Sequence, residues 1–356
     1  MKKLVIKIGS SFFINDKGEI NKKNILELIK QISIIKQKGV SCCLISSGAI
    51  AVGVKKMGYS VKPANIAKKQ ACAAIGQMFL MQEYEQVFSL FDLQCAQILL
   101  NHDDFGNRKR IISLKNTIEK LFSMNVVPVI NENDALAVDE IKVGDNDTLS
   151  AMVSLVLDAD MLILVSDVDG LYSANPKHNP DAKLLKEIDD ITDDIRAMAG
   201  GAGTVYGTGG MSTKIKAGEI AVNSGIPMMI VNKTKIDRLS AVADGQNIGS
   251  LFKGKKEHLD LKESWIKYCA NIDGRIVVDD GAKKAVKNRK SLLNCGIVSV
   301  SGQFRRGEVV ELSDENGNIF AKGVTLFDFS ELKKIPDLKK SKEIAIHANN
   351  IVILEK

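Results

Sequence analysis

Short apolar runs alternate with amphipathic helical patterns over about the first 255 residues of the chain. Leu4–Ile8 is a β-rich run that stops at a Gly-Ser-Ser sequence, and Asn24–Gln37 places its apolar residues on one helical face. Val40–Ser46 has the pattern of a buried strand, and Asn65–Phe91 that of a long helix broken near Gly76. Further short apolar runs are Cys95–Leu100, Val126–Ile130, Met161–Val165 and Met228–Val231. This alternation predicts an α/β fold with a mostly parallel sheet sandwiched by helices.

The pattern changes after residue 255, where a charged stretch is followed by short strands and turns. The expected strands are Ile276–Val278, Ile297–Val300, Val309–Leu312 and Ile344–Ile346. Asp314–Gly317 has the composition of a hairpin turn, and Ala282–Lys287 that of a short helix. These features predict a small C-terminal β-barrel. We therefore expect two domains, residues 1–258 and residues 272–356.

Composition and charge exclude several classes of protein. The chain has 356 residues, of which 45% are hydrophobic and 26% charged, as in ordinary globular proteins, so disorder and collagen-like repeats are excluded. The net charge is +6, and residues 272–356 carry 15 basic and 12 acidic residues. Because no segment is a basic tail, charge alone does not indicate a nucleic-acid partner.

The cysteines and the N-terminus bear on the cellular compartment. The six cysteines form no Cys-x-x-Cys pair and no metal-ligand spacing, so we expect buried, reduced thiols and no metal site built by the protein. The first residues lack an apolar stretch long enough for a signal peptide, and no run is long enough to span a membrane. The expected location is the cytoplasm.

Small and acidic side chains follow several of the predicted strands. Such residues are Gly9–Ser11, Ser47 and Gly48, Asn131–Asp134, and Ser166 and Asp167. Ligands of parallel sheets bind beyond the carboxyl ends of the strands. The sequence therefore predicts a binding site at this edge of the sheet.

A glycine-rich segment precedes one predicted helix. Six of the eleven residues 200–210 are glycine, and Met211, Ser212, Thr213 and Lys214 follow. Glycine lets the backbone approach phosphate oxygens, and a helix N-terminus presents free N–H groups. A flexible surface loop would explain the glycines alone, but the order from Thr208 to Lys214 favours phosphate binding. The segment is neither a Walker A loop nor a dinucleotide-binding turn.

Lys7 is a second candidate phosphate ligand. It lies inside the apolar first strand, two residues before Gly9, where burial without an anionic partner would be costly. At a solvent-facing sheet edge it would serve only to prevent strand pairing. The adjoining Gly-Ser-Ser sequence favours a phosphate ligand.

Two polar clusters are candidates for substrate binding. Asp145, Asn146 and Asp147 precede an apolar helix, and capping explains only one of them. Asn131–Asp134 ends the Val126–Ile130 strand with four hydrogen-bonding side chains. Their carboxylates would repel an anionic substrate, so they should meet an ammonium group or a metal ion. The four histidines share no motif, and nothing indicates a Ser-His-Asp triad or a zinc site.

With these motifs, the chain resembles the glutamate 5-kinase group of the amino-acid kinase family over nearly its whole length. The motifs are Lys7–Ser11, Ser46–Ile50, Val127–Asp134, Ile141–Asp147 and Gly207–Lys214. The resemblance implies an amino-acid kinase domain over 1–258 and a PUA domain over 272–356.

The resemblance also implies roles for individual residues. ATP would be bound by Lys7, Ser166, Asp167, Thr208, Gly209, Gly210, Met211, Ser212, Thr213 and Lys214. Ser47, Asp134 and Asn146 would hold L-glutamate, while Lys7 and Lys214 would be catalytic and Asp147 would organise the two lysines.

The implied reaction moves the γ-phosphoryl group of ATP, with Mg²⁺, to the side-chain carboxylate of L-glutamate as the first step of proline biosynthesis. Proline as feedback inhibitor, a homo-oligomer and hand-over of the labile product to glutamyl-phosphate reductase are further implications. Two alternatives stay open. One is a family member with a different acid acceptor. The other is an RNA-binding protein that acts through its PUA domain, and the small net charge of residues 272–356 argues against it.

Overall fold

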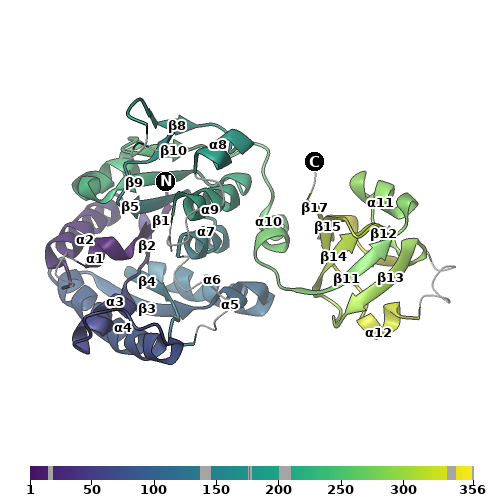
Figure 1. Cartoon of the computed structure of the whole chain (residues 1–356), viewed down its shortest axis with the longest axis horizontal. Coiled ribbons are helices and arrows are strands. Elements are labelled where there is room, and N and C mark those ends of the chain that lie inside the picture. The colour runs from purple at the N-terminus through teal and green to yellow at the C-terminus, as the bar shows by residue number, and fades with distance from the viewer. Residues whose placement is uncertain are drawn as a thin grey trace. The chain divides into compact units, whose positions relative to one another are not determined.

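The computed structural model describes residues 1–14, 19–136, 146–174, 176, 179–199, 210–334 and 342–354. The chain divides into two compact units (Figure 1). One contains Met1–Asp104 and Lys109–His258, and the other contains Phe105–Arg108 and Leu259–Lys356. In the described part of the chain, no helix combines the length and the hydropathy that a membrane span needs.

An eight-stranded sheet forms the centre of the first unit. Its order is β3 (Gln94–Leu100), β4 (Val126–Glu132), β2 (Ser41–Ile45), β1 (Lys3–Ile8), β5 (Met161–Ser166), β9 (Met228–Asn232), β10 (Ser250–Phe252) and β8 (Glu187–Ile188). Every neighbouring pair is parallel except β9 and β10. The predicted mostly parallel α/β sheet is confirmed, and its central strands are apolar because helices cover both faces.

Helices cover the sheet on two sides (Figure 1). Those of one face are α2 (Lys22–Gln37), α4 (Ile66–Ser89) and the 3₁₀ helix η1 (Lys233–Asp244), whose apolar residues share one core with the strands. On the opposite face, α7 (Asn146–Leu157) packs against β1, β5 and α9 (Met211–Asn223). The remaining elements of this region are α1 (Ser10–Phe13), α3 (Ala49–Lys56), α5 (His102–Gly106), α6 (Arg108–Ser123), α8 (Asp193–Met198) and the β6–β7 ribbon (Leu171–Tyr172 and Leu184–Leu185).

The alternation of side chains along β1 separates Lys7 from its apolar neighbours. Ile6 and Ile8 belong to the core that contains α2 and α4. Successive side chains of a strand point to opposite faces, so Lys7 points towards α7. It is buried there, with 7% of its surface exposed.

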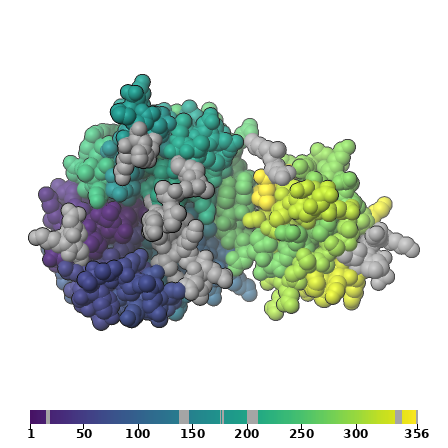
Figure 2. Space-filling model, viewed as in Figure 1, coloured from purple at the N-terminus to yellow at the C-terminus, as the bar shows by residue number. Residues whose placement is uncertain are grey.

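The predicted break of the long helix near Gly76 is wrong. Helix α4 runs without interruption from Ile66 to Ser89, and Gly76 instead lies against α3. A Cβ at Gly76 would come within 1.8 Å of the Ala49 carbonyl oxygen. A Cβ at Gly53 would come equally close to the Cys72 carbonyl oxygen. Glycine is therefore required for close backbone packing of these helices, whose dark-blue atoms lie together in Figure 2.

The second unit is built from short strands, as predicted. A five-stranded sheet has the order β13 (Ile297–Gly302), β11 (Ile272–Val278), β14 (Val309–Ser313), β15 (Ile319–Val324) and β17 (Ile351–Ile353). A separate ribbon pairs β12 (Leu292–Leu293) with β16 (Ile344–Ile346). The helical elements are α10 (Leu261–Tyr268), α11 (Asp280–Lys287), η2 (Asn294–Gly296), α12 (Phe329–Leu332) and η3 (Ala348–Asn350). The hairpin predicted at Asp314–Gly317 joins antiparallel β14 and β15.

All six cysteines are free thiols. Cys42, Cys43, Cys72 and Cys269 are buried, whereas Cys95 is half-buried and Cys295 is exposed. Burial raises the pKa of the Cys42 thiol to about 12. The Cys42 thiol therefore stays protonated at neutral pH, and the buried thiols pack as small apolar side chains.

Candidate active site

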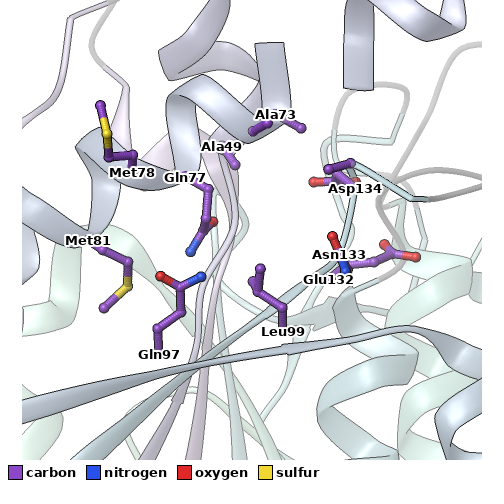
Figure 3. Close-up of a pocket in the computed structure, with 12 residues that line it drawn as sticks. Ala49, Ala73, Gln77, Met78, Met81, Gln97, Leu99, Glu132, Asn133 and Asp134 are labelled. Carbon is purple, nitrogen blue, oxygen red and sulfur yellow. The ribbon is translucent and has the colours of Figure 1, made fainter. Parts of the chain in front are cut away.

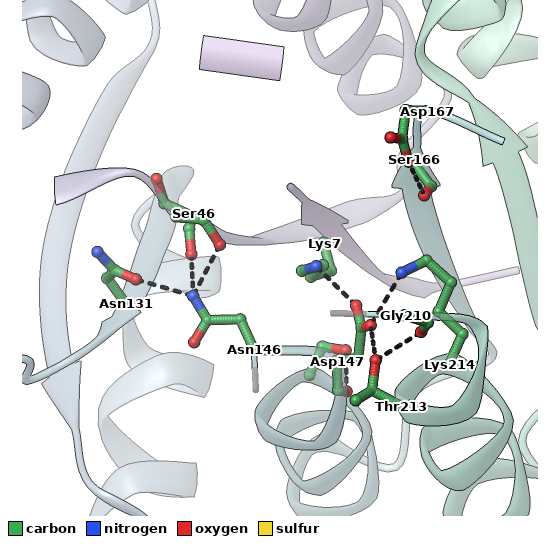
Figure 4. Close-up of polar contacts among 12 residues, drawn as sticks. Lys7, Ser46, Asn131, Asn146, Asp147, Ser166, Asp167, Gly210, Thr213 and Lys214 are labelled. Atoms are coloured by element: carbon green, nitrogen blue, oxygen red, sulfur yellow. Dashed lines mark hydrogen bonds and ion pairs between the residues drawn. The ribbon is translucent and has the colours of Figure 1, made fainter. Parts of the chain in front are cut away.

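Two buried lysines share one buried carboxylate at the carboxyl edge of the sheet (Figure 4). Asp147 lies in the first turn of α7, and its Oδ1 is 2.6 Å from Nζ of Lys7. Its Oδ2 is 3.1 Å from Nζ of Lys214, which comes from the first turns of α9. The three side chains are at most 9% exposed. Residues from β1, α7 and α9 thus meet in one charged cluster.

The charges of the lysines keep Asp147 ionised. Burial by itself disfavours the charged carboxylate, but Lys7 and Lys214, with hydrogen bonds from Lys7 and Thr213, outweigh it and hold the pKa of Asp147 below its ordinary value. Two ammonium groups against one carboxylate leave an excess of one positive charge. Because water is largely excluded, this charge attracts an anion more strongly than a surface lysine would.

The N-terminus of α9 adds backbone donors beside this cluster. Gly210 is the N-cap residue, and no side chain in the described part of the structure caps the helix. Oγ of Thr213 lies 2.8 Å from both Oδ2 of Asp147 and the Gly210 carbonyl oxygen. Free N–H groups and the partial positive charge of a helix N-terminus suit a phosphate group.

Ser166 and Asp167 end β5 at the same edge of the sheet (Figure 4). Oγ of Ser166 donates a hydrogen bond of 3.1 Å to Oδ1 of Asp167. Ser166 is buried, whereas Asp167 is exposed. These residues therefore place a hydroxyl and a carboxylate at the same edge of the sheet as the lysine cluster.

A chain of amide side chains lies beside the lysine cluster. Nδ2 of Asn146 donates to the Ser46 carbonyl oxygen and to Oγ of Ser47, both at 2.8 Å, and to Oδ1 of Asn131 at 3.1 Å (Figure 4). Nδ2 of Asn131 in turn donates to Oε1 of Gln77 at 2.8 Å. Because Asn146 directly precedes Asp147, the amide chain and the charged cluster are adjacent.

Gln77 and Asp134 line a cavity of about 420 Å³ between α4 and the ends of β3 and β4 (Figure 3). The other lining residues are Ala49, Ala73, Ala74, Met78, Met81, Gln97, Leu99, Glu132, Asn133 and Ala135. Burial and the charge of Glu132 raise the pKa of Asp134 to about 7, although Lys62 opposes this. Oε1 of Glu132 lies 3.5 Å from Nδ1 of His102. The cavity therefore combines apolar walls with two carboxylates, a combination that suits a small ammonium-bearing molecule.

Comparison with known proteins identifies the family. The model of the amino acid kinase family matches residues 2–232, and the PUA domain model matches residues 274–347. The chain belongs to the amino acid kinase family. It is 41% identical to a protein named Glutamate 5-kinase from Caldanaerobacter subterraneus subsp. tengcongensis, over 99% of this chain and 98% of that protein. Relatives of the same name from Streptococcus sanguinis and Carboxydothermus hydrogenoformans are also 41% identical, over 99% and 100% of this chain and 96% and 98% of theirs.

Among solved structures, the chain is similar to an isopentenyl phosphate kinase, with a TM-score of 0.48 and 16% identity over 70% of this chain and 100% of that one. The UMP kinase from Bacillus anthracis has a TM-score of 0.49 and 13% identity, covering 71% of this chain and 96% of that one.

The structure of this amino acid kinase brings the predicted residues together in two adjoining groups. Lys7, Asp147, Thr213 and Lys214 form one group through direct contacts. Ser47 and Asn146 form the other through a direct hydrogen bond. Asp134 lines the cavity. Met211 and Ser212 occupy the first turn of α9, half-buried and exposed, respectively. Thr208, Gly209 and the preceding glycines lie outside the described residues, as does Asp145.

Sequence reasoning missed Gln77 and gave Asn131 no individual role. Both side chains are nearly inaccessible to solvent, with 8% and 1% of their surfaces exposed. One feature of the sequence could have indicated Gln77. It is a polar residue next to Gly76, in a helix whose buried face consists mostly of small or apolar residues. A polar residue on such a face needs a hydrogen-bond partner, but the sequence does not say which residue supplies it.

Proposed function

We propose that this amino acid kinase transfers the γ-phosphoryl group of ATP to the side-chain carboxylate of L-glutamate, forming γ-glutamyl phosphate and ADP. The observation that carries the proposal is the buried Lys7–Asp147–Lys214 cluster beside the N-terminus of α9. The full-length similarity to relatives named Glutamate 5-kinase supports the choice of acceptor.

The cluster supplies what phosphoryl transfer to a carboxylate requires. A carboxylate is already ionised at neutral pH, so the reaction needs no general base. The main obstacles are repulsion between two anions and the negative charge on the transferring group. Lys7 and Lys214 would neutralise this charge, and Asp147 would hold both ammonium groups in place before the substrates bind.

The second group of residues would hold the amino acid. The Asp134 carboxylate suits an ammonium group, while Ser47 and Asn146 lie beside the cluster where the acceptor must approach. Under this proposal, the amino acid would be recognised around Asn146 and the phosphates would bind around Asp147 and the N-terminus of α9. This division also explains why the site relies on lysines, amides and carboxylates rather than histidines.

Mg²⁺ would accompany ATP in this reaction. In the part of the chain that the structure describes, no three His, Cys, Asp or Glu side chains form a group that could hold a metal ion. Mg²⁺ in kinases keeps several waters and binds mainly to substrate phosphates and one or two carboxylates, so it does not require a group of three protein ligands. The ion would supply positive charge to the phosphate oxygens, and the chain would contribute its lysines.

The first test measures ADP release with Mg²⁺-ATP and L-glutamate, L-aspartate, N-acetyl-L-glutamate or no acid, with hydroxylamine present to trap an acyl phosphate. We expect turnover and hydroxamate formation with L-glutamate. Turnover with another acid alone would overturn the acceptor but keep the phosphate site. No turnover with any acid would overturn the kinase activity, and a salt-dependent RNA titration would then test the PUA domain.

The second test replaces the two lysines. We expect Lys7→Ala and Lys214→Ala each to lower kcat by about 10²–10³ or more, as the loss of one preorganised donor does in other enzymes. Lys38→Ala is the control, because this lysine forms an exposed ion pair with Asp244. Near-normal turnover in folded Lys7 and Lys214 variants would contradict the proposed role.

Four features of the cellular setting stay predictions. These are a place in the cytoplasm, assembly as a homo-oligomer, inhibition by proline, and hand-over of the acyl phosphate to glutamyl-phosphate reductase. Adding proline to the first assay tests the regulation directly.

A further inference from the structure

We propose that Gln77 and Asn131 are positioning residues that aim Oδ1 of Asn146 at the ammonium group of the amino-acid substrate. The inference rests on the proposed function, because it concerns how the acceptor amino acid is bound. Gln77 lies in none of the sequence motifs, and Asn131 lies in a candidate substrate-binding cluster without an individual role there.

A backbone group sets the orientation of the first amide. The N–H group of Glu132 donates to Oδ1 of Asn131 at 3.0 Å. A backbone N–H can only donate, so the atom that it meets must be the oxygen of the side-chain amide. Nδ2 of Asn131 therefore points the other way, where Oε1 of Gln77 accepts its hydrogen bond at 2.8 Å.

The orientation of Asn131 is passed on to Asn146. Oδ1 of Asn131 and the Ser46 carbonyl oxygen are both acceptors, so Asn146 must turn its Nδ2 towards them. If the Asn146 amide were flipped, its oxygen would face two other oxygens and lose these hydrogen bonds. Oδ1 of Asn146 consequently points away from the chain of amides.

This oxygen lacks a hydrogen-bond partner in the described part of the structure, although Asn146 is only 5% exposed. A buried acceptor without a donor costs free energy, so such atoms are rare in stable folds. A substrate ammonium group is a donor that would satisfy it. Since Asn146 immediately precedes Asp147, the amino acid would be held directly beside the lysine cluster.

The packing of α3 against α4 determines where Gln77 lies. Gly76 contacts the backbone of Ala49 so closely that no side chain fits between the two helices. Ala49 begins α3 just after Ser46 and Ser47, which accept hydrogen bonds from Asn146. Helix α4 therefore brings Gln77 to the strand ends through backbone contact, and Figure 3 shows this side chain extending from α4 into the cavity.

A double-mutant cycle tests the inference. Gln77→Met keeps the length of the side chain but removes the acceptor for Asn131. We expect it to raise KM for glutamate by about 3–10-fold, and Asn146→Ala to raise it by about 10–100-fold, as expected for neutral and charged hydrogen bonds. In both variants KM for ATP should stay unchanged. Because Gln77 acts through Asn146, adding Gln77→Met to Asn146→Ala should produce almost no further increase.

Gln31→Met is the matched control. Gln31 is a buried glutamine of α2, and its side chain bonds to Glu27 and to the backbone N–H of Ser240. This variant should lose stability comparably to Gln77→Met but keep the KM for glutamate. An equal rise of KM in both variants would reduce Gln77 to a structural role and overturn the inference.

Glutarate, which lacks the ammonium group, provides the second readout. The wild-type enzyme should prefer glutamate over glutarate, and Gln77→Met and Asn146→Ala should both lower this preference. Equal use of the two acids by the wild-type enzyme, or additive effects in the double variant, would overturn the positioning role while leaving the kinase activity intact. Failure of the wild-type enzyme with every acid would instead show that the proposed function itself is wrong.

Discussion

Replacing Asp147 by asparagine separates charge from shape at the centre of the site. The amide occupies nearly the same volume and can still accept a hydrogen bond from Thr213. The Asp147 carboxylate now lies 2.6 Å from Nζ of Lys7 and 3.1 Å from Nζ of Lys214. In the variant, both buried ammonium groups lose this counter-charge.

The magnitudes follow from this burial. Removing one partner of a buried ion pair lowers the free energy of unfolding by about 3–5 kcal/mol, because an uncompensated charge is left inside. This is a large fraction of the roughly 5–15 kcal/mol that stabilises a typical domain. The lysines would also move apart, so kcat should fall by about 10²–10³. KM for ATP should not rise, since the variant has one more positive charge beside the phosphates.

Denaturant unfolding and hydroxamate formation measure the two effects. Asp244→Asn is the matched control, because the Lys38–Asp244 pair has a similar length of 2.7 Å but is exposed. Exposed pairs contribute at most about 1 kcal/mol, so this variant should be nearly as stable and as active as the wild-type enzyme. If Asp147→Asn lost no more stability than Asp244→Asn and kept its kcat, the shared carboxylate would not organise the lysines.

Three further predictions concern the acceptor side of the site. Because the pKa of Asp134 is raised to about 7, kcat/KM for glutamate should rise with pH up to about 7 and then level off. Asp134→Asn should abolish this pH dependence. A flat profile in the wild-type enzyme would contradict a role of Asp134 in binding ammonium. The same raised pKa means that, between about pH 4 and 7, the folded state holds a proton that the unfolded chain has released. The free energy of unfolding should therefore fall as the pH rises through this range. Urea unfolding at several pH values measures this fall, and Asp134→Asn should remove it. Gly76→Ala places a Cβ 1.8 Å from the Ala49 carbonyl oxygen. It should lower the free energy of unfolding by about 1–3 kcal/mol and raise KM for glutamate. Gly58→Ala is the control and should leave KM unchanged, because Gly58 has open space around it.

Much of the fold follows from local pattern. The run Met161–Val165 is apolar throughout, and Leu4–Ile8 is apolar except for Lys7, as the interior strands of a helix-covered sheet require. The single failure among these elements is instructive. Gly76 suggested a helix break because glycine weakens isolated helices, but the packing of α3 against α4 outweighs that weak preference.

The residues of the lysine cluster could also be singled out from the sequence. Lys7 drew attention because a lysine in a buried strand must have an anionic partner, and that partner is Asp147. Lys214 and Thr213 follow a glycine-rich segment and begin a helix, which is a local signal for phosphate binding. Each of these inferences depends on a residue and its neighbours along the chain.

By itself, the sequence determined the order of helices and strands and the edge of the sheet at which the candidate site residues lie. Only the tertiary structure decided which side chains meet, since periodicity reports burial but not partners. Asn131 bonds to Gln77 across 54 residues, and Asn146 bonds to Ser46 across 100 residues. No local pattern encodes such pairs, because the helices and strands that bring them together are placed by packing throughout the core.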